Sequence, residues 1–324
     1  MLHVRCGDDI LPKLKAAGLP GELMRWADPL CQGPTPRGLT PSAWRRTRAR
    51  FAVGHYGVTL KEAYAFLDDQ NKKLEQYRTH EEIVLWFEHD LFDQVILVYL
   101  LDWWSRRPRA RQKISLICVG KFPGKKRFTG LGTLESKELA GLFPGRQVVT
   151  LEQFKLARRA WEAWTHPTPL ALQALGRADT AALPFLKKAI RRHMEQFPSK
   201  KNGLSLSEQW ALEAVVEGAN EPQAIFEAVQ AREERLWCGD AMFWWYLDEL
   251  IDGREPLLRV LRGGWKHNGR VPSVKFRLTE RGVRVMREEE DWLERNPIDR
   301  WLGGVHLKGS KVWRWDGVKK HVTR

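Results

Sequence analysis

Residues 83–87 read IVLWF, and they are followed directly by EHDLFDQ at 88–94 and by an apolar stretch that reaches Trp104. An unbroken apolar run of this length is typical of a strand buried on both faces of a parallel sheet. The polar residues behind it suit a turn, and the apolar stretch beyond them suits a helix. This stretch therefore predicts an α/β domain with a mostly parallel sheet flanked by helices.

Other segments of the first half fit the same architecture. Residues 2–6 (LHVRC) predict a short strand that ends at Gly7, and residues 114–119 (ISLICV) predict a second buried strand. Residues 147–149 predict one more strand. Between and after these strands, helices are expected at 10–17, 41–53, 60–76 and 151–164.

The second half of the chain has a different order of elements. Helices are expected within 171–192, and a polar break follows at 198–203. Three helices (205–217, 222–232, 240–251), two strands (256–261, 274–278) and a helix opening at Thr279 then resemble a winged helix-turn-helix module. We thus expect an α/β domain at 1–155, a helical connector at 156–200, a winged-helix-like domain at 201–295 and a C-terminal β-hairpin tail at 296–324.

The composition bears on partners and on location. Lys and Arg number 54 against 40 Asp and Glu, so the net charge is +14 and the chain attracts polyanions. Nucleic acid is the first partner to consider, and a basic surface without a specific partner is the alternative. No CxxC spacing, secretory leader or membrane-length apolar stretch is apparent, so we expect a cytoplasmic protein with no membrane partner. Composition does not indicate the oligomeric state.

Three motifs in order carry a resemblance to a known family. They are HVRCGDD at 3–9, DPLCQGP at 28–34 and WFEHDLFDQ at 86–94. Together they resemble the bacterial family called domain of unknown function 1835, over roughly the first 155 residues, and the remainder resembles the companion segment that commonly follows it. The resemblance implies the domain division and does not imply a reaction.

Acidic residues follow two of the predicted strands. Ligands of parallel α/β sheets bind beyond the carboxyl ends of the strands, where loops and helix N-termini converge. The candidate catalytic residues are Asp8, Asp28, Glu88, His89, Asp90 and Asp93. Among them Asp8, Asp90 and Asp93 are the candidate ligands of a divalent cation, Mg²⁺ or Mn²⁺. His89 would act as a base or proton shuttle, and Arg45, Arg48 and Arg50 would bind phosphate.

Structural roles are the alternative for the same residues. Acids at the start of a helix cap its free N–H groups, which would account for Asp8, Asp9, Asp90 and Asp93 without any ligand. His89 would then be a hydrogen-bonded residue at the strand end, and the arginines a solvated helix face or an ion network. A Gly-rich phosphate loop, a Walker lysine and a GxGxxG motif are absent from the sequence, which disfavours common ATPase and dinucleotide chemistry.

The winged-helix-like segment has an acidic part and a basic part. Its third helix, 240–252, has four acids and no Lys or Arg, so it would repel phosphates. The segment between and within the two strands is basic, and its candidate nucleic-acid-binding residues are Arg262, Lys266, Arg270 and Lys275, with His267 beside them. We expect contact with the nucleic-acid backbone through this wing, or no nucleic-acid contact at all.

The favoured hypothesis is a nucleic-acid-associated protein whose α/β domain has a polar site, metal-dependent or not, that acts on a nucleotide or a phosphodiester. Two alternatives remain open. One is a non-enzymatic DNA-binding regulator that senses a small anionic ligand. The other is a protein-interaction module that uses some of the 16 Trp residues.

Overall fold

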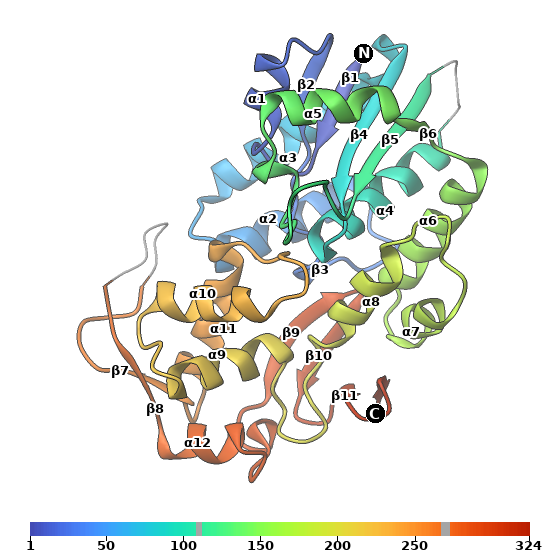
Figure 1. Ribbon diagram of the computed structural model, residues 1–324. Coiled ribbons are helices and arrows are strands. Elements are labelled where there is room, and N and C mark those ends of the chain that lie inside the picture. Colours follow the sequence, from blue (N-terminus) through green and yellow to red (C-terminus); the bar gives the residue numbers. More distant parts are fainter. Residues whose placement is uncertain (108–111, 267–272) are drawn as a thin grey trace.

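The computed structural model describes residues 1–107, 112–266 and 273–324. It confirms the expected class, a mixed α/β protein with a mostly parallel N-terminal sheet flanked by helices and with antiparallel strands toward the C-terminus (Figure 1). Among the described helices, none combines the length and the apolar character needed to cross a membrane.

The main sheet has five strands in the order β2-β1-β4-β5-β6. Their bounds are β1 (Leu2–Arg5), β2 (Glu22–Arg25), β4 (Glu82–Glu88), β5 (Lys113–Val119) and β6 (Gln147–Val148). The first four are parallel and only β6 is antiparallel. The predicted strands of the first half are thus confirmed, and β2 is an edge strand that the sequence patterns did not predict.

The two faces of β4 explain its unbroken apolar run. Leu85 and Phe87 pack into the larger core, whereas Val84 and Trp86 pack into a second core on the opposite face. Alternate residues of a strand point to opposite faces, so both sets must be apolar when helices cover both sides. The helices of the N-terminal half are α1 (Leu11–Ala16), α2 (Pro41–His55), α3 (Leu60–Glu75), α4 (Leu91–Ser105), α5 (Ser136–Leu142) and α6 (Leu151–Trp164).

The second half contains the expected order of helices and strands. It comprises α7 (Leu170–Arg177), α8 (Leu186–Met194), α9 (Leu206–Val216), α10 (Pro222–Arg232), α11 (Asp240–Asp252), β7 (Leu258–Val260), β8 (Phe276–Leu278) and α12 (Glu280–Met286). Strands β7 and β8 pair antiparallel. The 3₁₀ turns of the chain are η1 (Gln76–Thr79), η2 (Leu131–Thr133), η3 (Phe143–Gly145) and η4 (Trp292–Glu294).

Helix α11 lies inside the molecule. Phe243, Trp244, Trp245 and Tyr246 are all buried, and Gln32 of the N-terminal half donates a hydrogen bond to the carbonyl of Met242 at 2.9 Å. A helix with buried side chains around most of its circumference has no free face to place in a DNA groove. Its acidic residues are gathered mainly at its C-terminal end.

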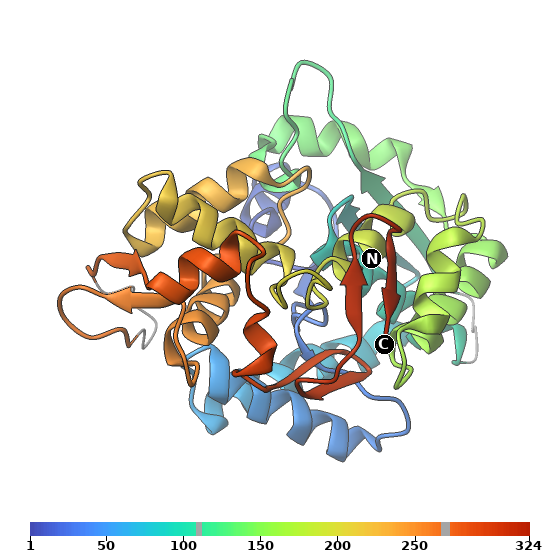
Figure 2. The ribbon, with the colours of Figure 1, turned by 90° about the horizontal axis from the view of Figure 1, so that it is seen from below.

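The C-terminal strands return to the N-terminal half. Strands β9 (Ile298–Gly303) and β10 (Val305–Gly309) pair antiparallel, and β9 also pairs parallel with β3 (Gly33–Pro34). The expected terminal hairpin is present as β11 (Arg314–Asp316) and β12 (His321–Thr323). Figure 2 shows these strands beside the helices of the first half, so the tail joins the body of the protein.

Candidate functional site

Strands β1 and β4 are neighbours, so the residues that follow them meet at one edge of the sheet. Arg5 is paired with Trp86 in the parallel register, which brings the ends of both strands together. The motifs at 3–9 and 86–94 begin within β1 and β4, and the motif at 28–34 begins three residues after the end of β2. The convergence expected from the sequence is therefore present for part of the acidic set.

Arg5 is the centre of this acidic group, which we call the Arg5 cluster (Arg5, Cys6, Asp9, Glu88, Asp90 and Asp93). Its guanidinium is buried and donates to Asp93 at 2.5 Å, to Glu88 at 2.6 Å and to both oxygens of Asp9 at 3.0 and 3.1 Å. Three carboxylates thus share one cation. Charge-assisted hydrogen bonds of this kind hold the strand ends in a defined arrangement.

Asp93 links the cluster to the backbone. Its carboxylate accepts the N–H of Glu88 at 2.8 Å and the thiol of Cys6 at 2.7 Å, besides the bond from Arg5. Asp90 is the N-cap of α4 and accepts the N–H of Asp93 at 3.1 Å, as the helix-capping alternative predicted. The other oxygen of Asp90 has no hydrogen-bond partner in the described part of the chain.

A glycine allows the loop before α5 to cover Glu88. Gly130 has φ +143°, and a Cβ placed on it would lie 2.7 Å from Oε2 of Glu88. The next residue, Leu131, donates its N–H to the same oxygen. The close approach and the unusual backbone conformation both require a residue without a side chain at this position.

The cluster has more negative than positive groups. Four carboxyl groups, of Asp9, Glu88, Asp90 and Asp93, surround Arg5, and no other cationic side chain is hydrogen-bonded to them within the described residues. Burial, and then the charge of Asp93, raise the pKa of the Glu88 carboxyl to about 7. Burial also raises the pKa of Asp90 and of Asp93. Near neutral pH the cluster must hold protons or gain positive charge.

Three of these carboxylates are placed to share a cation. Glu88, Asp90 and Asp93 each offer one oxygen, and the three oxygens lie within 4.8 Å of one another. Such hard oxygen ligands suit Mg²⁺ or Mn²⁺. A cation here would share the oxygens of Glu88 and Asp93 with Arg5, while Asp90 offers an oxygen that is not yet hydrogen-bonded.

Two of the five candidate acids lie outside this group. Asp8 is exposed and pairs with Arg25, so Glu88 takes the place expected for Asp8 among the cation ligands. Asp28 is buried and pairs with Arg48 at 2.7 Å. The expectation that Asp8 and Asp28 join the residues after β4 was wrong. Asp8 points to the surface because its neighbour on the edge strand β2 is a cation.

The three candidate phosphate-binding arginines of α2 differ in burial and in their partners. Arg48 is buried, and its donors go to Asp28 and to the carbonyls of Gln32, Pro29 and Pro34. Arg45 is half-buried and pairs with Asp68 of α3 at 2.5 Å, and Arg50 is exposed. Arg48 therefore belongs to a structural ion pair, which is the alternative that the sequence had left open, and does not reach the cluster.

The imidazole ring of His89 packs beside two aromatic rings and not among the acids of the cluster. Its ring lies 5.8 Å from the ring of Phe128 and 6.0 Å from that of Phe185, measured between centroids. Burial, and then the charge of Arg235, lower the pKa of His89 to about 4, so its imidazole is neutral at neutral pH. Its Nδ1 is buried without a hydrogen-bond partner in the described part of the chain. A role as base would need access from the side of Phe128 and Phe185.

Arg5, Cys6 and Asp9 are the members of the cluster that the list of candidate residues omitted. A signal was present, since an arginine at the end of a strand flanked by apolar residues must be paired when the strand is buried. Among the candidate wing residues, Arg262, Lys266 and Lys275 are exposed, and Lys275 lies 3.9 Å from Glu221. His267 and Arg270 lie outside the described residues.

Comparison of the chain with protein-family models gives no match, and comparison with curated proteins gives none either.

Proposed function

We propose that this protein is a nucleic-acid-associated hydrolase in which Glu88, Asp90 and Asp93 hold a divalent cation, Mg²⁺ or Mn²⁺, and act on a nucleotide or a phosphodiester. The observation that carries the proposal is the charge of the Arg5 cluster, where four carboxyl groups surround a single guanidinium. A bound divalent cation would offset this excess and would supply a Lewis acid for phosphate oxygens and an activated water.

The position of the cluster supports the same proposal. It lies at the carboxyl ends of β1 and β4, where ligands of parallel sheets bind. The start of α4 adds the partial positive charge of a helix N-terminus beside Asp90. Arg5 would orient the carboxylates, because it binds three of them at once.

Association with nucleic acid would use the basic wing, which we propose as part of a winged-helix-like module. Arg262, Lys266 and Lys275 are exposed on the segment that connects β7 and β8, whereas α11 is buried. The net charge of +14 would add long-range attraction. We further propose, on the three motifs, that the first 155 or so residues belong to the domain of unknown function 1835 family.

The decisive experiment measures cation binding and hydrolysis together. Thermal unfolding with and without Mg²⁺ or Mn²⁺ should show a stabilisation that is larger at pH 8 than at pH 6, since cations bind the deprotonated carboxylates. Hydrolysis is assayed on nucleotides and on single- and double-stranded DNA and RNA with the same cations.

Asp90→Asn is the sharpest variant, because asparagine keeps the N-cap oxygen and removes only the charge. It should abolish both the cation response and turnover. Asp102→Asn is the matched control, since Asp102 is a buried carboxylate of the same helix that pairs with Arg106 outside the cluster. An unchanged cation response in Asp90→Asn, or no turnover of any substrate by the parent protein, would refute the proposal.

A further inference from the structure

The edge strand β6 pairs with only part of β5. Its two residues lie opposite Ser115 and Leu116, and the chain just before β6 forms the 3₁₀ turn η3, which contains Pro144. The turn, and the proline that has no backbone N–H to donate, end the antiparallel pairing at Leu116. Residues 117–119 of β5 therefore form an outer edge of the main sheet, beyond the end of the short β6 (Figure 1).

The backbone of Cys118 faces this open edge. Val149 donates its N–H to the carbonyl of Ile114 at 2.8 Å, so the backbone groups of Ile114 face the side of β6. Alternate residues of a strand direct their N–H and carbonyl groups to the same side, which places those of Leu116 and Cys118 there too. Leu116 lies opposite Gln147 of β6, whereas Cys118 has no strand opposite it on that side within the described residues. Unpaired N–H and carbonyl groups at a sheet edge are a template for a further strand.

A cavity of about 360 Å³ follows the open edge, and we call it the β5 groove. Residues 116–119 of β5 all line it, although their side chains alternate between the two faces of the sheet. Its walls come from both layers that cover the sheet: Leu142 of α5 packs against the core on one face, and Leu97 of α4 and Leu183 belong to the core on the other. A cavity that touches the strand and both covering layers lies at the edge of the sheet, between those layers.

The charges around the groove that lack a partner are positive. Lys121 follows the end of β5, Lys137 lies on α5 one turn before the part that lines the groove, and Lys187 is in the first turn of α8. These three lysines are exposed, and none makes a hydrogen bond or ion pair with a residue that the structure describes. Glu138 of α5 and Glu152 of α6 each already pair with a different lysine. The surroundings of the groove therefore favour a negatively charged occupant.

We propose that the β5 groove binds an extended acidic peptide segment of a partner protein, which adds to β5 as a strand beyond the end of β6. The main chain of the peptide pairs with the N–H and the carbonyl of Cys118, and its alternate side chains enter the two walls of the groove. Acidic residues of the peptide lie near the three lysines. The site is independent of the proposed hydrolase function, because it shares no residue with the Arg5 cluster.

Three peptides test the proposal on the full chain. The probe is Asp-Val-Thr-Val-Asp with blocked ends, and amide-resolved NMR should show saturable changes at Cys118 together with slower hydrogen exchange of its N–H. The same peptide with N-methyl groups on its three central residues cannot pair as a strand and should bind at least about fivefold more weakly. Lys-Val-Thr-Val-Lys should also bind at least about fivefold more weakly. No saturable binding of the probe, or equal affinity of either control peptide, would overturn the proposal.

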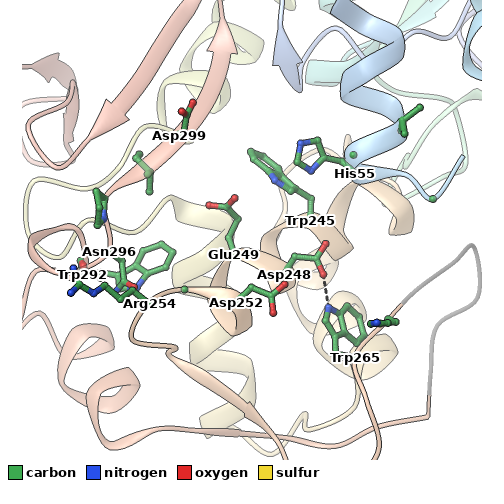
Figure 3. A pocket seen from close by; sticks show the side chains of 17 residues that line it. His55, Trp245, Asp248, Glu249, Asp252, Arg254, Trp265, Trp292, Asn296 and Asp299 are labelled. Atoms are coloured by element: carbon green, nitrogen blue, oxygen red, sulfur yellow. Dashed lines mark hydrogen bonds between the residues drawn. The ribbon is translucent and has the colours of Figure 1, made fainter. Parts of the chain in front are cut away.

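Two glycine variants place the same side chain in two different cavities. Gly141→Phe fills the β5 groove and should abolish binding, because Gly141 lines the groove and a Cβ there meets nothing within 4 Å. A Cβ at Gly54 of α2 also meets nothing within 4 Å, and Gly54→Phe fills the separate cavity that His55 and Trp245 line (Figure 3). This control should leave the affinity unchanged. Unaltered binding by Gly141→Phe, or an equal loss in both variants, would refute the groove as the site.

Charge variants provide a check that does not alter packing. Replacement of Lys121, Lys137 and Lys187 by Gln should weaken binding of the acidic probe by about fivefold. The same replacement at the three lysines of α3, Lys61, Lys72 and Lys73, should not change it. Similar affinities of the two triple variants would contradict the preference for an acidic peptide.

Sedimentation of the parent protein tests the other occupant of an open sheet edge, a second copy of the chain. We expect no dimer that depends on the groove. A dimer that Gly141→Phe abolishes would show that a second copy pairs with β5, and it would overturn the assignment to a partner's peptide.

Discussion

Glu82 and Glu88 lie at opposite ends of β4, and the pKa values of their carboxyl groups move in opposite directions. The hydrogen bond from Arg146 lowers the pKa of Glu82 to about 2, whereas burial and the charge of Asp93 raise that of Glu88 to about 7. The carboxylate of Glu82 contacts Arg146, Lys113 and Ser115, and it shares none of them with another carboxylate in the described part of the chain. The carboxylate of Glu88, by contrast, shares Arg5 with two other carboxylates. The amino end of the strand is thus electrostatically satisfied, and the carboxyl end has unbalanced negative charge.

This difference predicts the pH dependence of stability. A carboxyl that binds its proton more tightly in the folded state makes the free energy of unfolding fall as the pH rises, here between 4.5 and about 7. Glu88→Gln should reduce that fall. Glu82 contributes stability above pH 4.5 that is lost as the pH drops toward 2, so Glu82→Gln should flatten only the acid limb. Urea unfolding from pH 3 to 8 measures both, and identical profiles for the two variants would contradict the assignment.

Arg5 should be among the most sensitive positions of the protein. Arg5→Met removes the only cation hydrogen-bonded to the cluster within the described residues, and it leaves buried carboxylates unpaired, which costs about 3–5 kcal/mol. Arg25→Met removes an exposed arginine that pairs with Asp8 and should change stability little. Denaturant unfolding at pH 7 compares them, and equal losses would show that Arg5 does not organise the cluster.

Helix α2 offers a comparison of a buried and an exposed ion pair. Asp28→Ala leaves the buried Arg48 without its carboxylate and should cost about 3–5 kcal/mol. Asp68→Ala breaks the exposed pair with Arg45 and should leave the thermal midpoint nearly unchanged. If Asp28→Ala lowers the stability as little as Asp68→Ala does, Arg48 does not depend on the ion pair with Asp28 in solution. Arg48 would then again be a candidate for binding an anion.

The loop over Glu88 gives a steric test. Gly130→Ala forces a Cβ against Glu88 at a backbone conformation that alanine rarely adopts, so we expect a loss of about 1–3 kcal/mol. Gly141→Ala, in α5, meets nothing within 4 Å and should stabilise the helix by about 0.5–1 kcal/mol. Thermal unfolding distinguishes a loss from a gain, and a neutral Gly130→Ala would mean that the loop does not cover Glu88.

The basic wing predicts a specific salt dependence. Replacing Arg262, Lys266 and Lys275 by alanine should reduce the slope of log affinity against log salt by about 0.9 for each phosphate that the wing no longer neutralises. Replacing Lys61, Lys72 and Lys73 of α3 removes the same formal charge elsewhere. Binding to double-stranded DNA is measured by fluorescence anisotropy. A slope that changes equally in both triple variants would indicate general attraction without specific binding by the wing.

Much of the architecture was predictable because it depends on local patterns. The strand at β4, the helix after it, and the order of α9, α10, α11, β7 and β8 follow from hydrophobic periodicity and turn residues. Strand β2 was missed because four residues of mixed polarity have no clear period. Its role as an edge strand depends on pairing with β1, which is a long-range contact.

The candidate site was predictable only in part. Glu88, Asp90 and Asp93 were found because they follow a recognisable strand, and their mutual approach within 4.8 Å agrees with that expectation. Asp8, Asp28 and Arg48 were grouped with them by proximity to strand ends alone. In the fold their side chains point to other partners, Arg25 for Asp8 and each other for Asp28 and Arg48.

The α/β class, most strands and helices, and the excess of positive charge could be predicted from the amino-acid sequence, because these properties depend on residue type and near-neighbour spacing. The pairing of the charges, the burial of α11 and the pairing of β3 with β9 became evident from the assembled fold alone. Pairing and burial depend on which segments pack together, and a charged side chain binds whichever opposite charge that packing brings within a few ångströms.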